Sequence, residues 1–173
     1  MMKKVLALAL SMAMMVSALA GCGGKGGGTT AKTPEELTQA YLDAITEHGG
    51  EMVEYNPVIT EAKEGEFSAL MLETLGLKAE DMQAFGISMS MMLVQAYTIA
   101  AIYPAEGKAD AVKQALQTHI DNQIKAFESY LPGPFEVAKN AKLETLEDGT
   151  ILLVMCEDQN AVFDAISAQL AKA

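Results

Sequence analysis

The stretch ISMSMMLVQAYTIAAIY, residues 87–103, decides the fold, because it carries no charged residue and forms either one buried helix or two strands. Apolar side chains alternate with small or polar ones in two runs, which favours strands at about residues 86–93 and 96–103. The alternating apolar positions are Ile87, Met89, Met91 and Leu93 in the first run, and Tyr97, Ile99, Ala101 and Tyr103 in the second. The connection at Val94-Gln95 lacks turn residues, so the buried helix stays open as the alternative.

On the C-terminal side of this stretch, the pattern predicts a long helix. Pro104 ends the second strand, and apolar residues at helical spacing indicate a helix over about residues 108–130. The segment Pro132-Gly133-Pro134 prevents that helix from continuing.

A hairpin and a closing helix are expected next. Asp148-Gly149 is the strongest two-residue hairpin signal, and it joins strands predicted near residues 138–146 and 150–156. The segment from Ile151 to Cys156 is apolar at every position, which is typical of a central strand that is buried on both faces. The closing helix carries Val162, Phe163, Ile166 and Leu170.

Two helices are predicted on the N-terminal side. Thr33-Pro34-Glu35-Glu36 is a capping box that starts the first, and Gly49-Gly50 ends it. The second lies near residues 67–75, and a short turn follows at 79–84. The order helix, helix and ββαββα predicts an α+β fold, a two-layer domain with a four-stranded antiparallel sheet and helices on one face.

The first residues have the parts of a secretory signal. Lys3 and Lys4 precede 16 uncharged residues, fewer than the roughly 20 apolar residues of a membrane-spanning helix. This run ends in Leu19-Ala20-Gly21-Cys22, which resembles the lipobox of bacterial lipoproteins. The resemblance implies a diacylglyceryl thioether on Cys22 and cleavage between Gly21 and Cys22. The alternative is a plain secretory signal with an incidental cysteine.

The expected organisation is a lipoprotein signal peptide over residues 1–21, a lipidated cysteine and glycine-rich tether over 22–32, and a single domain over 33–173. After cleavage, ten lysines face 23 acidic residues, a net charge of −13. Nucleic acid requires a basic surface, so it is not an expected partner. Cys156 is then the only free thiol, so no disulfide is expected. The expected location is the outer face of the cell membrane, held there by lipid, and no cofactor or metal is expected.

The central and C-terminal parts resemble a family of small bacterial lipoproteins known as domain of unknown function 4358. The segments that carry this resemblance are IAAIYPAEGKADAV at residues 99–112 and AFESYLP at residues 126–132. We expect it to extend over residues 37–170, and it implies a membrane-anchored setting without implying catalytic residues. Thr98 and Thr150 stand where members often carry an acidic and an aromatic residue.

A few side chains are candidates for chemistry. His48 is expected to pack at the C-terminal end of the apolar stripe of the first helix, and His119 at the edge of the buried stripe of the long helix. Met89, Met91 and Met92 could bind Cu(I) through their thioethers, but methionine also fills cores, and core packing is the favoured interpretation. Cys156 is expected to be a buried structural thiol.

The acidic clusters are interpreted as solvated faces, and no motif of a known enzyme class is present. They are Glu61, Glu64 and Glu66; Glu80 and Asp81; Glu144, Glu147 and Asp148; and Glu157 and Asp158. We therefore do not expect an enzyme. The leading hypothesis is a binding or protein-interaction module for an envelope protein, peptide or wall component. The alternatives are a solute-binding lipoprotein that serves a transporter and a small envelope hydrolase that uses acidic residues.

Overall fold

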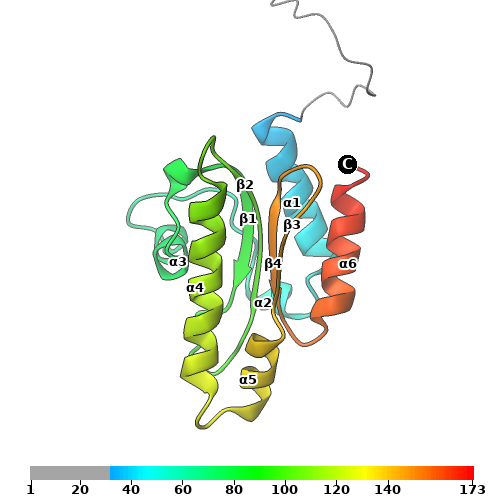
Figure 1. The fold of residues 1–173 in the computed structure, drawn as a ribbon. Helices are drawn as coiled ribbons and strands as arrows, with labels where there is room; N and C mark the ends of the chain where they lie inside the picture. Colours follow the sequence, from blue (N-terminus) through cyan, green and yellow to red (C-terminus); the bar gives the residue numbers. More distant parts are fainter. Residues whose placement is uncertain (1–31) are drawn as a thin grey trace, which may run out of the picture. The chain divides into compact units, whose positions relative to one another are not determined.

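The computed structural model describes residues 32–173 (Figure 1). The helices are α1 (Pro34–His48), α2 (Met52–Tyr55), α3 (Phe67–Leu75), α4 (Ala109–Phe127), α5 (Pro132–Lys139) and α6 (Gln159–Leu170). The strands are β1 (Met82–Met89), β2 (Thr98–Pro104), β3 (Lys142–Thr145) and β4 (Ile151–Met155), and a 3-10 turn at Ala79–Asp81 precedes β1. These residues form one compact unit that contains both of the apolar cores described below.

The strands form one antiparallel sheet in the order β1-β2-β4-β3. The two-strand interpretation of residues 87–103 is confirmed, and the buried-helix alternative is wrong. The strand bounds differ from the prediction, because β1 begins at Met82 and pairing ends at Met89 opposite Thr98. The residues between them form a loop, so Val94-Gln95 is part of a longer connection than the two-residue turn that was expected.

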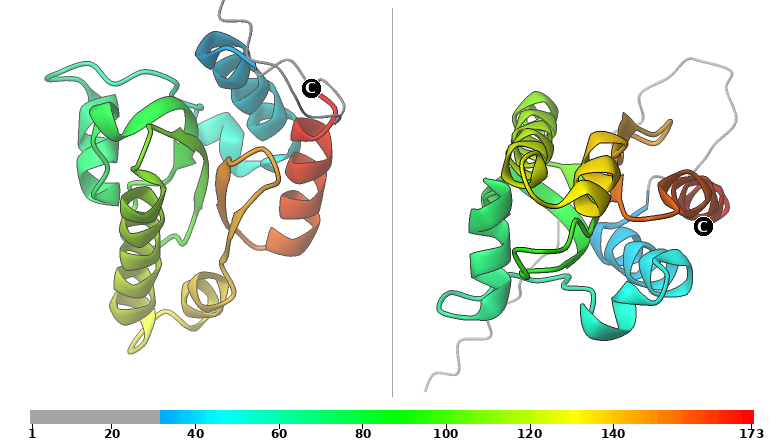
Figure 2. Two further views of the ribbon diagram at one scale, coloured as in Figure 1. Left: turned by 45° about the horizontal axis from the view of Figure 1, so that its top comes forward. Right: turned by 90° about the horizontal axis from the view of Figure 1, so that it is seen from below.

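Helices cover both faces of this sheet, so the predicted α+β sheet is confirmed, whereas its prediction as two layers with helices on one face is wrong. Figure 2 shows α3 and α4 on one side of the sheet and α1 and α6 on the other. The physical reason lies in β2 and β4, whose central residues are buried on both faces. Apolar side chains that project to both sides of a strand need a covering layer on each side.

The first core lies between the sheet and the layer of α3, α4 and α5. Its largest buried residues are Met71, Leu75, Ile87, Ile102, Leu116, Phe127, Ile151 and Leu153. The second core lies between the other sheet face and α1, α2 and α6. It contains Tyr41, Ile45, Ile99, Leu152, Val154, Phe163 and Ile166. In this second layer α1 approaches β1 closely at Gly86, where an added Cβ would lie 2.8 Å from the Cβ of Tyr41.

The capping box predicted at the start of the first helix is present in the structure. Thr33 Oγ1 accepts a hydrogen bond from the backbone N–H of Glu36, and the Glu36 carboxylate accepts one from the Thr33 N–H, which completes the capping box. The long helix ends before Pro132, as predicted. The segment from Pro132 then starts a short helix that was not predicted, α5, because a proline is well suited to the first turn of a helix. The strand predicted at 138–146 is consequently shortened to β3.

Candidate functional site

The loop between β1 and β2 exposes apolar side chains at its tip. The Gln95 N–H donates to the Met92 carbonyl at 3.1 Å, and this bond closes a turn around Leu93 and Val94. Ser90 Oγ donates to Gln95 Oε1 at 2.7 Å and accepts from the Met92 N–H at 3.2 Å. Leu93 is 90% exposed, Met92 60% and Val94 53%. The loop therefore has an internally hydrogen-bonded form that holds three apolar side chains in solvent.

Beside this tip lies an open groove of about 570 Å³. Its walls come from α2 and the segment after it, from α3, and from the end of β1 with the following loop. The lining residues are Met52, Tyr55, Asn56, Pro57, Ile59, Phe67, Met71, Met89, Met91, Met92 and Gln95. Five of these residues are methionines, whose flexible and polarizable side chains adapt to differently shaped apolar partners. Tyr55 and Phe67, which also line the groove, are 79% and 58% exposed.

The segment after α2, which forms one wall of the groove, is attached to strand β1 by backbone and side-chain hydrogen bonds. Ile59 and Ile87 exchange two backbone hydrogen bonds, of 2.8 and 2.9 Å, across the outer edge of β1. Ser88 Oγ donates to the carbonyl of Asn56, and the buried Tyr97 hydroxyl lies 3.0 Å from the same Ser88 oxygen. Burial raises the pKa of Tyr97 to about 12, so this hydroxyl stays protonated at neutral pH. These contacts keep the wall of the groove in place without a ligand.

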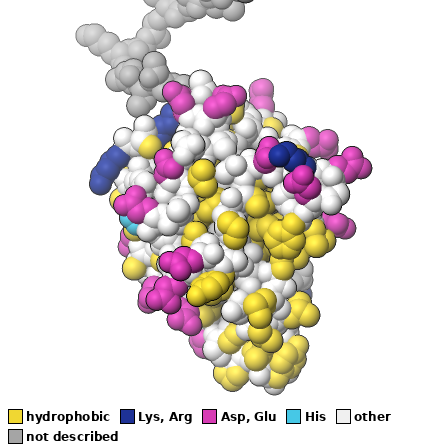
Figure 3. Space-filling model, turned by 180° about the vertical axis from the view of Figure 1, so that it is seen from behind, with side chains coloured by type: hydrophobic (Ala, Val, Ile, Leu, Met, Phe, Trp, Pro, Cys, Tyr) yellow, Lys and Arg dark blue, Asp and Glu magenta, His cyan; other side chains and the backbone are white. Residues whose placement is uncertain are grey.

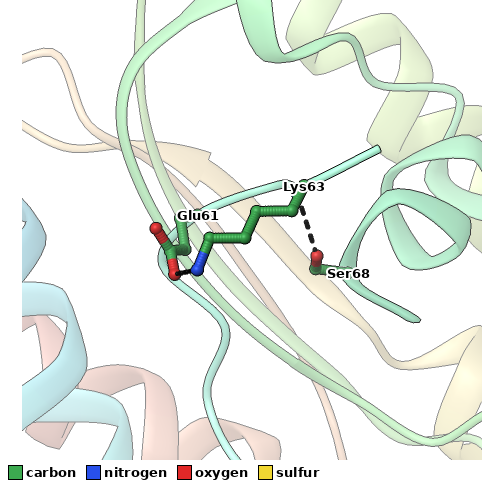
Figure 4. A network of polar contacts seen from close by, with 3 residues as sticks. All are labelled: Glu61, Lys63 and Ser68. Carbon is green, nitrogen blue, oxygen red and sulfur yellow. Dashed lines mark hydrogen bonds and ion pairs between the residues drawn. The ribbon is translucent and has the colours of Figure 1, made fainter. Parts of the chain in front are cut away.

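The loop that enters α3 carries a small polar network at its surface (Figure 4). The Lys63 ammonium pairs with the Glu61 carboxylate, and the Lys63 backbone N–H donates to Ser68 Oγ at 3.2 Å. The Glu61 and Lys63 side chains are both exposed, so the pair contributes little to stability. The pair has a local electrostatic effect, because Glu61 neutralises Lys63, the one lysine of this loop.

Hydrophobic side chains gather on one face of the molecule and extend to its lower end, whereas acidic side chains lie mainly across the top, along the left side and at the upper right (Figure 3). The large exposed apolar residues of the groove and the hairpin tip are Tyr55, Phe67, Met92, Leu93 and Val94, and Leu70 of α3 is exposed as well. Exposed apolar side chains that are grouped in this way are typical of binding sites.

The three methionines singled out in the sequence are separated by the fold. Met89 is buried in the first core, as expected. Met91 is half-buried against that core, and Met92 is exposed. The expectation that all three pack in the core is therefore wrong for Met92, because the strand pairing ends before it.

The two histidines lie on different helices. His48 is half-buried in the last turn of α1. His119 is 5% exposed and its Nε2 lies 3.1 Å from Thr98 Oγ1, so it packs in the interior and not at the edge of the buried stripe of α4. Burial lowers the pKa of His119 to about 4, so the imidazole is neutral at pH 7.

Cys156 follows β4 and is buried in the second core, as predicted. Burial raises the pKa of its thiol to about 11, and the nearby carboxylates of Asp158 and Glu157 act in the same direction. Nucleophilic cysteines have a lowered pKa, so this thiol is suited to packing and not to covalent chemistry.

Some of the acidic residues have structural partners. Asp148 accepts hydrogen bonds from the backbone N–H and the hydroxyl of Thr150, both at 2.9 Å, and Thr150 Oγ1 lies 2.7 Å from the buried Tyr41 hydroxyl. Asp81 pairs with Lys108 at 2.7 Å. Across residues 32–173, no three acidic, histidine or cysteine side chains are grouped so that they could hold a metal ion.

The predicted lipid attachment site Cys22 and the lipobox residues Leu19, Ala20 and Gly21 lie outside the described residues. Within residues 32–173, no helix combines the length and apolar character that crossing a bilayer requires.

The fold and the groove together define a small α+β domain with an apolar groove beside a β-hairpin. The chain belongs to the family of the domain of unknown function DUF4358, whose model matches residues 59–156. The match is shorter than the 37–170 expected from the sequence. It comprises the four strands with α3, α4 and α5, and it leaves out α1, α2 and α6. No curated protein and no solved structure matches the chain.

Proposed function

We propose that this chain is a lipid-anchored, non-catalytic binding domain on the outer face of the cell membrane. Its methionine-rich groove and the adjacent hairpin tip would hold an apolar segment of an envelope protein or peptide. The lipid on Cys22 would keep the domain at the membrane surface, where such partners are concentrated.

The observation that carries the proposal is the exposure of Met92, Leu93 and Val94 on a hairpin whose shape is fixed by its own hydrogen bonds. Leu93 and Val94 occupy the centre of a turn, where glycine, asparagine, aspartate or proline would be more favourable. A sequence that departs from local preferences at an exposed site commonly does so for function. Methionine and aromatic side chains, which dominate the groove, are also enriched in protein interfaces.

The groove also bears on the two alternatives. It is partly open to solvent and its lining side chains are mostly apolar, which suits an apolar segment of polypeptide better than a small polar solute enclosed by two lobes. No carboxylate lines it, so a hydrolase that uses paired acids would need a different site. The binding hypothesis is therefore the one that the geometry supports best.

The test uses the full chain in living cells, with a photo-crosslinking side chain at Met92. A second protein carries the same side chain at Glu147, an exposed residue of the β3–β4 hairpin at the other end of the sheet. We expect a discrete crosslinked product in the envelope fraction from Met92 only, and we expect Phe67→Ser to remove it. The same products from both positions would contradict the proposal, as would a product that Phe67→Ser leaves unchanged.

A further inference from the structure

A second hollow of a different chemical character adjoins the groove. This hollow has a volume of about 650 Å³ and shares Pro57 with the groove. It is lined by Leu42, Thr46, Glu47, Gly50, Glu51, Val53, Glu54, Pro57 and Val58. Three of these residues are exposed glutamates, and no lysine is among them. We call this surface the glutamate hollow.

Helix α2 separates the two surfaces. Met52 and Tyr55 face the groove, whereas Val53 and Glu54 face the glutamate hollow. The two surfaces meet at Pro57, which lines both of them. A segment bound in the groove that extends past Pro57 would bring its next residues toward the three carboxylates.

Among the described residues, no lysine or histidine forms an ion pair with the carboxylates of the glutamate hollow. His48 lies next to Glu47 in the sequence without pairing with it, and Lys63 on the neighbouring loop is paired with Glu61. The net charge of the whole chain is −11. A partner with acidic residues next to its apolar segment would be repelled, whereas one with lysine or arginine there would be attracted.

From this arrangement we infer that the partner is a cationic amphipathic polypeptide segment, with apolar residues in the groove and basic residues over Glu47, Glu51 and Glu54. The inference rests on the proposed function and goes beyond it by naming the chemistry of the partner. A membrane surface is the less favourable occupant, because anionic lipid headgroups would be repelled by the same carboxylates. All three glutamates lie outside the residues that match the family, so we infer this preference for this chain and not for the family.

The experiment measures the affinity of residues 32–173, which contain both cores, for three synthetic peptides. The peptides share one apolar segment of leucine and phenylalanine, and the adjacent segment is rich in lysine, glutamine or glutamate. We expect the lysine peptide to bind about tenfold more tightly than the glutamine peptide, as three exposed ion pairs would give. The glutamate peptide should bind most weakly, and the difference should shrink at high salt.

Two triple variants test whether the preference depends on the position of the glutamates. The variant E47Q/E51Q/E54Q should bind the lysine and glutamine peptides with affinities within about twofold of each other. The matched control E106Q/E144Q/E147Q removes the same charge from exposed residues at the other end of the sheet, and it should keep most of the preference. Equal loss in both variants would overturn the inference, because it would show that net charge alone attracts the peptide.

The remaining outcomes separate this inference from the proposed function. If all three peptides bind equally and Phe67→Ser weakens them, the groove binds apolar segments but the charge inference is overturned. If no peptide binds, or if Phe67→Ser has no effect, the proposed function fails as well. Suppose that no peptide binds, but that the domain sediments with zwitterionic or anionic vesicles and Leu93 is required for this sedimentation. That result would overturn the inference in favour of a membrane surface.

Discussion

Acidification is expected to destabilise this domain through one side chain, His119. In the folded protein its pKa is about 4 because the imidazole is buried beside Thr98. Unfolding returns it to water, where its pKa is about 6.5. The folded pKa is below the unfolded one, so the unfolded state binds the proton more readily. Stability is therefore complete above pH 6.5 and decreases as the pH falls toward 4.

The size of the effect follows from the two pKa values. Between pH 7 and pH 4.5, the free energy of unfolding should decrease by roughly 2 kcal/mol from His119 alone. The control is His119→Gln, whose amide can still bond to Thr98 Oγ1 but does not titrate. Other acidic and basic groups titrate in both proteins, so the difference between the two pH profiles isolates His119.

The assay is urea unfolding followed by circular dichroism at several pH values between 4.5 and 7.5, with the midpoint and slope fitted separately. The wild-type protein should lose more stability than His119→Gln over this range. Parallel profiles for the two proteins would refute the reasoning, since they would mean that the folded state binds the proton as readily as the unfolded state.

Four further predictions test the packing, the thiol, the hairpin tip and the anchor. Gly86→Ala should destabilise the domain by about 1–3 kcal/mol in urea unfolding, because its Cβ would meet Tyr41 at 2.8 Å; an unchanged midpoint would contradict this packing. Cys156 should react with a disulfide reagent at pH 8 only after unfolding, since its thiol is buried with a pKa of about 11; rapid labelling of the native protein would count against it. Leu93→Ser should leave the melting temperature unchanged, because the side chain is exposed, yet it should lower crosslinking from Met92, whereas Leu93→Met should preserve it. Cys22→Ala should abolish incorporation of labelled fatty acid and release the chain from the membrane fraction, and continued membrane association would contradict the lipid anchor.

Much of the local structure could be predicted from short segments of sequence. The capping box at Thr33, the β3–β4 hairpin and the strand pairing around Ile87 and Ile99 each involve residues close together in the chain, and the structure contains all three. The hairpin connection is longer than the predicted two-residue turn at Asp148-Gly149, because the Gly149 N–H bonds to the Leu146 carbonyl and Gly149 has a positive φ. Helix α5 was not predicted, because two prolines next to a glycine indicate a loop as readily as a helix start.

The candidate site was only partly visible in the sequence. The lack of turn residues at Val94-Gln95 was the signal that could have found the hairpin tip, because an exposed turn built from leucine and valine needs a reason other than folding. The groove itself could not be predicted. Its walls join residues 52–59 to residues 89–95, and nothing in either segment specifies that they become neighbours.

The sequence alone determined the α+β class, the two hairpins and the acidic character of the chain, and it predicts the lipid anchor at Cys22, whereas the pairing of β2 with β4 came from the structure. Tertiary structure decided that helices cover both sheet faces, that Met92 is exposed while Met89 is buried, and that a methionine-rich groove adjoins three glutamates. The physical reason is the range of the interactions. Caps, turns and strand alternation depend on residues a few positions apart, whereas the covering of a face or the walls of a groove depend on which distant segments pack together.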